Sequence, residues 1–165
     1  MEVRDLMSAN PVACLPSDTC RTAGELMRRR RCGFLPVVDT PTGGRVVGVV
    51  TDRDLALYLA QADVPASQAS VNACMTPRPA MVGPGADLEE AARIMEERAV
   101  HRLPVVEEGR LVGVLSLKDI ALAARKQWAH AGPHLAERQL TEILEAIAAA
   151  QVPPGREGAR GAAED

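Results

Sequence analysis

Two seven-residue segments carry the residue types best suited to binding chemistry. The first reads Gly-Val-Val-Thr-Asp-Arg-Asp over positions 48–54, and the second reads Gly-Val-Leu-Ser-Leu-Lys-Asp over positions 113–119. Each contains a hydroxyl residue, then a cation, then a carboxylate three positions after the hydroxyl. The hydroxyl residues are Thr51 and Ser116, the cations are Arg53 and Lys118, and the carboxylates are Asp54 and Asp119.

This spacing has two physical explanations. A hydroxyl residue three positions before a carboxylate, at the start of an apolar run, is typical of a capping box, in which both side chains satisfy free backbone N–H groups. A helix N-terminus is also an anion site, where Thr51 and Arg53 are suited to hold a phosphate. The nearby Asp54 suits a ribose, because a carboxylate accepts hydrogen bonds from both hydroxyls of the diol. Both explanations remain open at this point.

These segments belong to a longer internal repeat. Nine residues of the first half return 68 positions later, and a second block that includes Thr51 and Asp54 returns 65 positions later. The three missing residues fall in the stretch from Asp39 to Arg45, where a hairpin turn tolerates deletion. A repeat of this length indicates a duplicated small domain, and two copies usually pack about a pseudo-two-fold axis. We therefore expect the binding site between the copies.

Each copy predicts the order strand, helix, strand, strand, helix. A turn of helix comes first (residues 3–7 and 71–75), then an extended stretch with proline, then a helix that starts after Thr19 or Asp87. Two short Val-rich runs follow, whose length and β-branching favour paired, buried strands. A second helix begins at Thr51 or Ser116. The predicted fold is α/β, with two tandem repeats and one further helix at the C-terminal end.

The predicted domain boundaries follow from these patterns. Residues 1–62 form repeat 1, residues 63–70 a linker, and residues 71–127 repeat 2. Residues 128–150 are a helical extension, and residues 151–165 are a tail whose Pro, Gly, Ala, Arg and Glu content predicts disorder. The extension places Leu140, Ile143, Leu144 and Ile147 on one face, which either packs on its own domain or on a second subunit.

Composition restricts the class of protein. With only Phe34, Tyr58 and Trp128 as aromatic residues, the core must be aliphatic. A net charge of -3 argues against nucleic-acid binding, which normally needs a basic surface. The sequence contains neither an apolar run of membrane-spanning length nor a signal-peptide pattern, so we expect a cytoplasmic protein without a membrane partner.

Three other features are best explained by structure rather than by chemistry. Four consecutive arginines (residues 28–31) end the first long helix, where the helix dipole favours them, although contact with a nucleotide phosphate or a partner is an alternative. The four cysteines lack a C-x-x-C spacing and are expected to be buried thiols. His130 and His134 are four residues apart, but Gly132-Pro133 interrupts that helical face, so no metal site is predicted.

Together these features resemble a pair of CBS domains, the module named after cystathionine beta-synthase. The resemblance rests on two copies of the unit, each with a Leu-Pro-Val-Val strand and a Gly-x-x-[Ser/Thr]-x-x-Asp ending, and covers residues 3–126. The Thr-Asp-Arg-Asp-Leu sequence of repeat 1 is similar to small stand-alone bacterial members of the family. Members of the family fold the two copies into one disc with two clefts. Many of these proteins bind adenine nucleotides or S-adenosylmethionine in the clefts.

The resemblance implies roles for individual residues. Asp54 and Asp119 would accept the ribose hydroxyls, and Thr51 with Arg53 and Ser116 with Lys118 would lie beside phosphate. The adenine pocket would be formed by Val12, Pro36, Ala80 and Pro104.

His101 and Arg102 stand before the Leu-Pro-Val-Val strand of repeat 2. This segment is similar to one in the regulatory subunits of energy-sensing kinases, where the His and Arg reach phosphates, and a guanidinium binds phosphate with two donors. The alternative is an exposed pair that contacts only solvent. Repeat 1 has Gly33-Phe34 at the same place, so we expect the clefts to differ, with one empty or holding another ligand.

The predicted function is a non-catalytic energy-sensing module that binds an adenosyl ligand, forms a homodimer and passes its state to an unknown partner protein. No catalytic cofactor is expected. A ligand-free dimerisation scaffold is the alternative. A small enzyme fits less well, because no nucleophile stands beside a base and an orienting group.

Overall fold

A computed structural model describes residues 1–42 and 44–123 of the chain. The predicted C-terminal helix (residues 128–150), the tail and both histidines of the 130–134 pair lie outside the described residues. Within the described part, no helix is long and apolar enough to cross a bilayer. The order of elements in the sequence-based prediction is confirmed in both copies.

Repeat 1 begins with a single 3-10 turn and ends with the helix that Thr51 starts. Its elements are η1 (Val3–Asp5), β1 (Ser8–Ala9), α1 (Cys20–Arg30), β2 (Phe34–Val38), β3 (Val46–Thr51) and α2 (Asp52–Gln61). The side chain of Thr19 accepts a hydrogen bond from the Thr22 amide at 3.1 Å, which caps α1 at the predicted place. At the other end Arg31 adopts a left-handed conformation (φ 52°) that terminates the helix.

Repeat 2 follows the same order. Its elements are η2 (Val71–Ala73), β4 (Thr76–Pro77), α3 (Leu88–Glu97), β5 (Arg102–Glu107) and β6 (Arg110–Ser116), and residues 117–123 are helical. The Asp87 side chain caps α3 by accepting a hydrogen bond from the Glu90 amide at 2.8 Å. The two copies therefore use the same local signals at the same positions.

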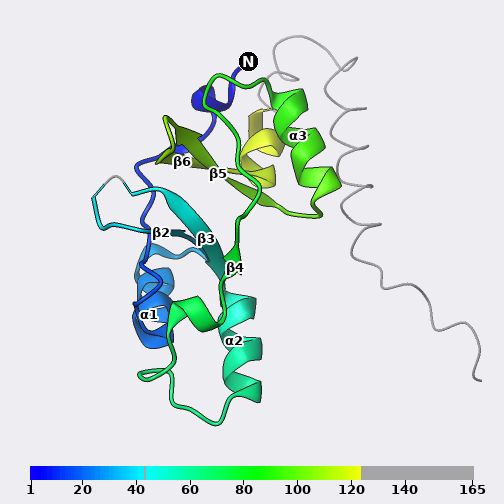
Figure 1. Ribbon diagram of the computed structural model, residues 1–165. Helices are drawn as coiled ribbons and strands as arrows, with labels where there is room; N and C mark the ends of the chain where they lie inside the picture. Colours follow the sequence, from blue (N-terminus) through cyan, green and yellow to red (C-terminus); the bar gives the residue numbers. More distant parts are fainter. Residues whose placement is uncertain (43, 124–165) are drawn as a thin grey trace, which may run out of the picture.

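The two copies exchange their first strands, which the sequence did not predict. β1 of repeat 1 pairs with β6 of repeat 2, and β4 of repeat 2 pairs with β3 of repeat 1, both antiparallel. The sheets accordingly have the orders β1-β6-β5 and β2-β3-β4. Figure 1 shows one sheet above the other, with α1 and α2 on the far side of the lower sheet and α3 beside the upper one.

The hydrophobic cores follow this exchange. Val3, from the first turn of repeat 1, is completely buried in the core of repeat 2 with Leu103 and Leu115. Val71 is likewise completely buried in the core of repeat 1. Burying one such valine contributes about 1.5–3 kcal/mol, so each N-terminal segment stabilises the other copy. The buried residues are aliphatic or sulfur-containing, as the scarcity of aromatic residues predicts.

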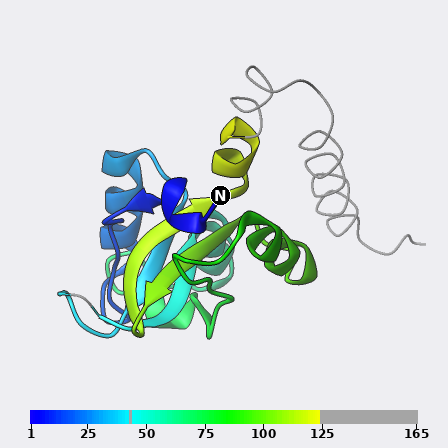
Figure 2. The same cartoon turned by 90° about the horizontal axis from the view of Figure 1, so that it is seen from above.

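Glycines at the crossing points make room for the exchanged strands. A Cβ on Gly48 would lie 2.8 Å from Sδ of Met75, and a Cβ on Gly113 would collide with the side chain of Met7. Each methionine comes from the opposite copy. The glycine of the Gly-x-x-[Ser/Thr]-x-x-Asp segment is therefore explained by packing between the copies. Seen from above in Figure 2, the strands of the two sheets lie over one another, so their inner faces enclose the space between the copies.

Two candidate ligand clefts between the copies

Both hydroxyl–carboxylate pairs form capping boxes. Oδ2 of Asp54 accepts hydrogen bonds from the Thr51 amide at 2.8 Å and from the Thr51 hydroxyl at 2.7 Å, while the Thr51 hydroxyl accepts one from the Asp54 amide at 3.1 Å. Ser116 and Asp119 make the same three bonds, at 2.9, 2.6 and 3.3 Å. The capping explanation is thus realised in both copies.

Capping leaves one carboxylate oxygen of each aspartate available. The two hydrogen bonds that each carboxylate accepts both use Oδ2, and among the described residues Oδ1 of Asp54 and of Asp119 has no hydrogen-bond donor. Both aspartates are half-buried, and each faces a cleft between the copies. A capped and therefore immobilised carboxylate with a spare oxygen is well suited to accept a hydrogen bond from a ligand hydroxyl.

The first cleft has a volume of about 430 Å³ and lies between the end of β3 and the start of β5. Repeat 1 supplies Thr51, Asp54 and Phe34, and Thr76 of the exchanged strand β4 lies on their side of the cleft. The other lining residues from repeat 2 include Arg78, Pro79, Ala80, Arg98, His101, Arg102 and Pro104. The exchange of strands thus creates a site that neither copy forms alone.

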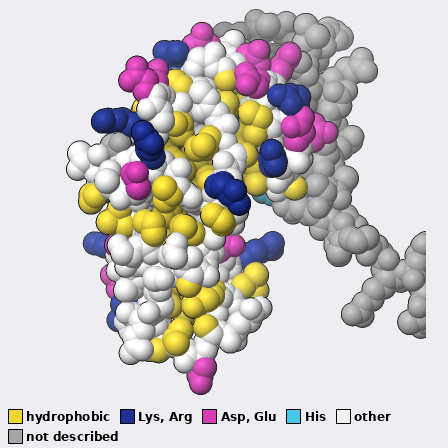
Figure 3. All heavy atoms as spheres, in the orientation of Figure 1, with side chains coloured by type: hydrophobic (Ala, Val, Ile, Leu, Met, Phe, Trp, Pro, Cys, Tyr) yellow, Lys and Arg dark blue, Asp and Glu magenta, His cyan; other side chains and the backbone are white. Residues whose placement is uncertain are grey.

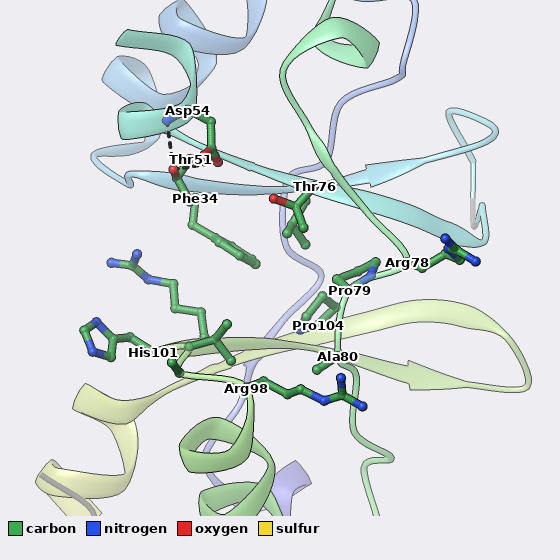
Figure 4. A pocket seen from close by; sticks show the side chains of 14 residues that line it. Phe34, Thr51, Asp54, Thr76, Arg78, Pro79, Ala80, Arg98, His101 and Pro104 are labelled. Carbon is green, nitrogen blue, oxygen red and sulfur yellow. Dashed lines mark hydrogen bonds between the residues drawn. The ribbon is translucent and has the colours of Figure 1, made fainter. Parts of the chain in front are cut away.

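Figure 4 shows how the polar side chains are distributed in this cleft. Thr51 and Asp54 lie above it, His101 lies at one end and Arg78 at the other, and the Phe34 ring projects into the space between. Ala80 and Pro104 lie together on the lower wall. The cleft therefore combines an apolar floor with hydrogen-bonding groups at its edges, as small-molecule sites commonly do.

The second cleft has a volume of about 340 Å³ and repeats this arrangement with the copies interchanged. Repeat 2 supplies Ser116 and Asp119, and repeat 1 supplies the apolar wall with Val12 and Pro36. Its other lining residues are Ser8, Asn10, Pro11, Arg30, Cys32, Phe34, Arg102 and Val114. Nearly every lining position has its counterpart 68 or 65 residues away in the first cleft.

Ten of the twelve residues singled out from the sequence line one of these clefts. Thr51, Asp54, Ala80, His101, Arg102 and Pro104 line the first, and Val12, Pro36, Arg102, Ser116 and Asp119 line the second. Arg53 and Lys118 line neither cleft, and both are exposed. Each of these two cations is the second residue of its helix.

Sequence reasoning missed Asn10, Arg78 and Arg98 as lining residues, and gave contact of Arg30 with a phosphate only as an alternative. Arg78 and Asn10 hold equivalent positions in the two clefts, and both have left-handed backbones with φ of 50°. Arg98 and Arg30 are likewise equivalent, each at the end of a long helix. A comparison of the copies around His101, extended a few residues upstream, would have identified Arg98. In Figure 3, basic side chains lie near the level where the two halves of the molecule meet.

Two of the four cysteines have thiols that are hard to ionise. Burial raises the pKa of the Cys14 thiol to about 12, and burial together with a hydrogen bond to Cys20 raises the pKa of Cys74 to about 12. A thiol with such a pKa is a poor nucleophile. Residues 1–42 and 44–123 hold no group of three or more His, Cys, Asp or Glu side chains suited to a metal ion.

Comparison with known proteins identifies the fold and its relatives. The profile of the CBS domain matches residues 3–61 and 70–126. The CBS domain-containing protein YhcV of Bacillus subtilis is 32% identical over 120 residues, which cover 73% of this chain and 83% of YhcV. Inosine-5'-monophosphate dehydrogenase of Streptococcus pyogenes is 30% identical over 140 residues, which cover 84% of this chain but 26% of that enzyme.

Among solved structures, CBSX2 in complex with AMP superimposes with a TM-score of 0.64 at 32% identity. The match covers 76% of this chain and 97% of CBSX2, whose source is Arabidopsis thaliana. The similarity therefore extends over both copies, and with them over both clefts.

Proposed function

Because this chain belongs to the CBS-domain family, with one domain matched in each half, we propose that it is a regulatory module that binds an adenosyl ligand between its two domains. The observation that carries the proposal is the position of Asp54 and Asp119. Each is fixed by its capping box at the edge of a cleft, with one carboxylate oxygen left for a ribose hydroxyl.

The cleft walls support an adenosyl ligand over other small molecules. Ala80 and Pro104 form an apolar surface on which a purine can pack, Thr51 adds a hydroxyl beside Asp54, and His101 lies at one end of the cleft. A volume of about 430 Å³ lies within the range of small-molecule sites. The AMP complex of CBSX2, a protein of the same fold at 32% identity, also supports this class of ligand.

The module acts by binding its ligand, without catalysis. Its thiols with raised pKa values are weak nucleophiles, and the match to inosine-5'-monophosphate dehydrogenase leaves most of that enzyme uncovered. A ligand that binds one arrangement of the two domains better than another shifts the population between them, and a partner protein that contacts one arrangement responds. The cytoplasmic location expected from the sequence stays a prediction.

A homodimer completes the proposal. Leu57 and Leu122 occupy equivalent positions on the second helix of each copy and are 56% and 46% exposed. Two large apolar side chains at symmetric positions suit isologous contact with a second copy of the chain. Light scattering at micromolar concentration is expected to give the mass of a dimer for the wild type and of a monomer for the Leu57→Glu/Leu122→Glu variant. A monomeric wild type would remove this part of the proposal.

A panel of ligands in thermal unfolding tests the class of ligand. A ligand present at about 100 times its dissociation constant stabilises the folded state by roughly 2.7 kcal/mol, which raises the melting temperature of a domain this size by roughly 5 to 10 °C. We expect a shift with at least one of AMP, ADP, ATP and S-adenosylmethionine, and little with GTP. Unchanged melting temperatures with all of them, and with NAD, would favour a ligand-free scaffold.

A further inference from the structure

The two clefts share part of their wall. Phe34 and Arg102 line both of them, and these residues hold equivalent positions in the two repeats. The guanidinium carbon of Arg102 lies 5.9 Å from the centroid of the Phe34 ring, within the range of a cation–π contact. One repeat thus supplies the cation and the other the ring, so a single guanidinium serves both clefts.

The other groups on this side of the clefts differ in their charge. The first cleft has His101, whose counterpart in the second is Gly33. A Cβ on Gly33 would lie 2.6 Å from Oδ2 of Asp52, so a carboxylate occupies the space next to the backbone where repeat 2 carries an imidazole. The counterpart of Asp52 in repeat 2 is the uncharged Leu117.

The remaining lining residues add to this difference. The first cleft has Arg78 where the second has the neutral Asn10. Arg98 of the first cleft corresponds to Arg30 of the second, so this pair gives no difference in charge. Once Arg102 is engaged in the first cleft, Arg30 is the one cation left among the described residues that line the second. Phosphate in the second cleft would then share it with the carboxylate of Asp119.

We propose that the protein sorts its two ligands by charge: the first cleft takes a phosphorylated adenosyl ligand, and the second takes an adenosyl ligand without phosphate. This inference rests on the proposed function of the clefts and assigns a ligand class to each. Arg102 is the shared specificity residue. Phosphate in the first cleft draws its guanidinium from Phe34, and this lowers the affinity of the second cleft for phosphate.

The shared guanidinium also couples the clefts. A charge-assisted hydrogen bond changes affinity by roughly tenfold or more, so AMP in the first cleft lowers the affinity of the second for AMP by a similar factor. The coupling is reciprocal, because each ligand must change the affinity of the other by the same factor. Adenosine has no phosphate to compete for Arg102, and its binding to the second cleft is therefore compatible with AMP in the first.

The test uses full-length variants with one cleft impaired. Asp119→Asn lowers the ligand affinity of the second cleft, so that binding to this variant measures the first cleft. Asp54→Asn lowers the ligand affinity of the first cleft, so that binding measures the second. Calorimetric titrations with AMP and with adenosine give the ratio of the two affinities for each variant. We expect AMP to bind at least tenfold more tightly than adenosine to Asp119→Asn. The preference for AMP should be clearly smaller in Asp54→Asn, because the remaining cleft lacks His101 and Arg78 even when Arg102 is free to enter it. Asp87→Asn, which alters a helix cap outside both clefts, serves as the control for the substitution itself.

A gain of function provides a second readout. Phe34→Arg places a guanidinium at the position equivalent to Arg102, so each cleft has its own. Combined with Asp54→Asn, it is expected to raise the AMP preference of the second cleft by roughly tenfold. Equal AMP preference in Asp54→Asn and Asp119→Asn would overturn the charge sorting while leaving the proposed function intact. Failure of the wild type to bind either compound would overturn the proposed function itself.

Discussion

The guanidinium carbon of Arg102 lies 5.9 Å from the centroid of the Phe34 ring, and the two residues stand at equivalent positions of two duplicated domains. The two copies thus differ in residue type at this pair of positions, and each of the two residues lines both clefts. A symmetric pair of phenylalanines would leave the clefts without this cation. A symmetric pair of arginines would place two like charges together.

Arg102→Ala is expected to lower the affinity for AMP by roughly tenfold or more and to leave the affinity for adenosine nearly unchanged. The guanidinium is assigned to phosphate, so its loss removes a charge-assisted hydrogen bond that adenosine does not make. Calorimetry with both ligands measures the difference, and Arg21→Ala, on an exposed arginine outside the clefts, is the matched control. Equal losses for the two ligands would show that Arg102 contacts the base or the sugar.

Asp54→Asn and Asp119→Asn separate capping from ligand binding. The side-chain oxygen of asparagine can still accept the hydrogen bonds from the amide and hydroxyl of Thr51 or Ser116. The free energy of unfolding should therefore fall by no more than roughly 1 kcal/mol in either variant. Affinity at the altered cleft should fall by about 1.5 to 3 kcal/mol, because a charged acceptor for the ribose hydroxyls is lost. Chemical denaturation and calorimetry measure the two quantities, with Asp87→Asn as a cap variant outside the clefts.

The opposite pattern would contradict the site. If both variants bind the ligand as the wild type does but unfold much more easily, Asp54 and Asp119 are caps alone. Asp87→Asn then shows how large a purely structural loss is.

Local sequence signals predicted the helices and strands of each repeat. They did not predict the pairing of strands between the repeats. Thr19, Thr51 and Asp87 are good N-cap residues before apolar periodic runs, and each caps the predicted helix. β1 and β4 are two residues long, and nothing in so short a segment distinguishes its own sheet from that of the other copy. The exchange is set by long-range burial of residues such as Val3 and Val71.

The candidate site was predictable where the residue type itself carries the chemistry. Thr51, Asp54 and their counterparts were identified because hydroxyl and carboxylate groups recur at fixed positions of the repeat. Arg102 was identified because its segment resembles one in which an arginine reaches phosphate. Arg78 and Arg98 were not, because an exposed arginine after a short strand or at a helix end usually has no further role. Their assignment requires the fold, which brings the end of α3 and the segment after β4 to one cleft.

Gly113→Ala is expected to destabilise the protein by roughly 1 to 3 kcal/mol. The new methyl group would overlap the side chain of Met7, which belongs to the exchanged segment of repeat 1. Gly83→Ala is the matched control, since a Cβ at Gly83 has no neighbour within 4 Å. Chemical denaturation measures both variants. Equal stability of the two would mean that Met7 moves aside freely and that the glycine is not needed for the strand exchange.

Alkaline pH is expected to destabilise the fold through Cys14. Burial raises the pKa of this thiol from 9.0 to about 12, so between these values the unfolded chain loses a proton that the folded chain retains. The contribution to stability is therefore complete below pH 9.0 and declines as pH rises toward about 12. Denaturation curves recorded across this range should fall less steeply with pH for Cys14→Ala than for the wild type. Parallel curves would show that Cys14 ionises equally in both states.

Calorimetric titration of AMP into the wild type and into the Asp54→Asn/Asp119→Asn double variant measures whether the clefts between the two CBS domains bind the ligand. Asparagine at both positions can still accept the hydrogen bonds of the capping boxes. We expect saturable binding of AMP to the wild type and a loss of affinity of roughly tenfold or more in the folded double variant. Equal affinity in the two proteins, or no heat of binding to a folded wild type, would contradict binding in these clefts.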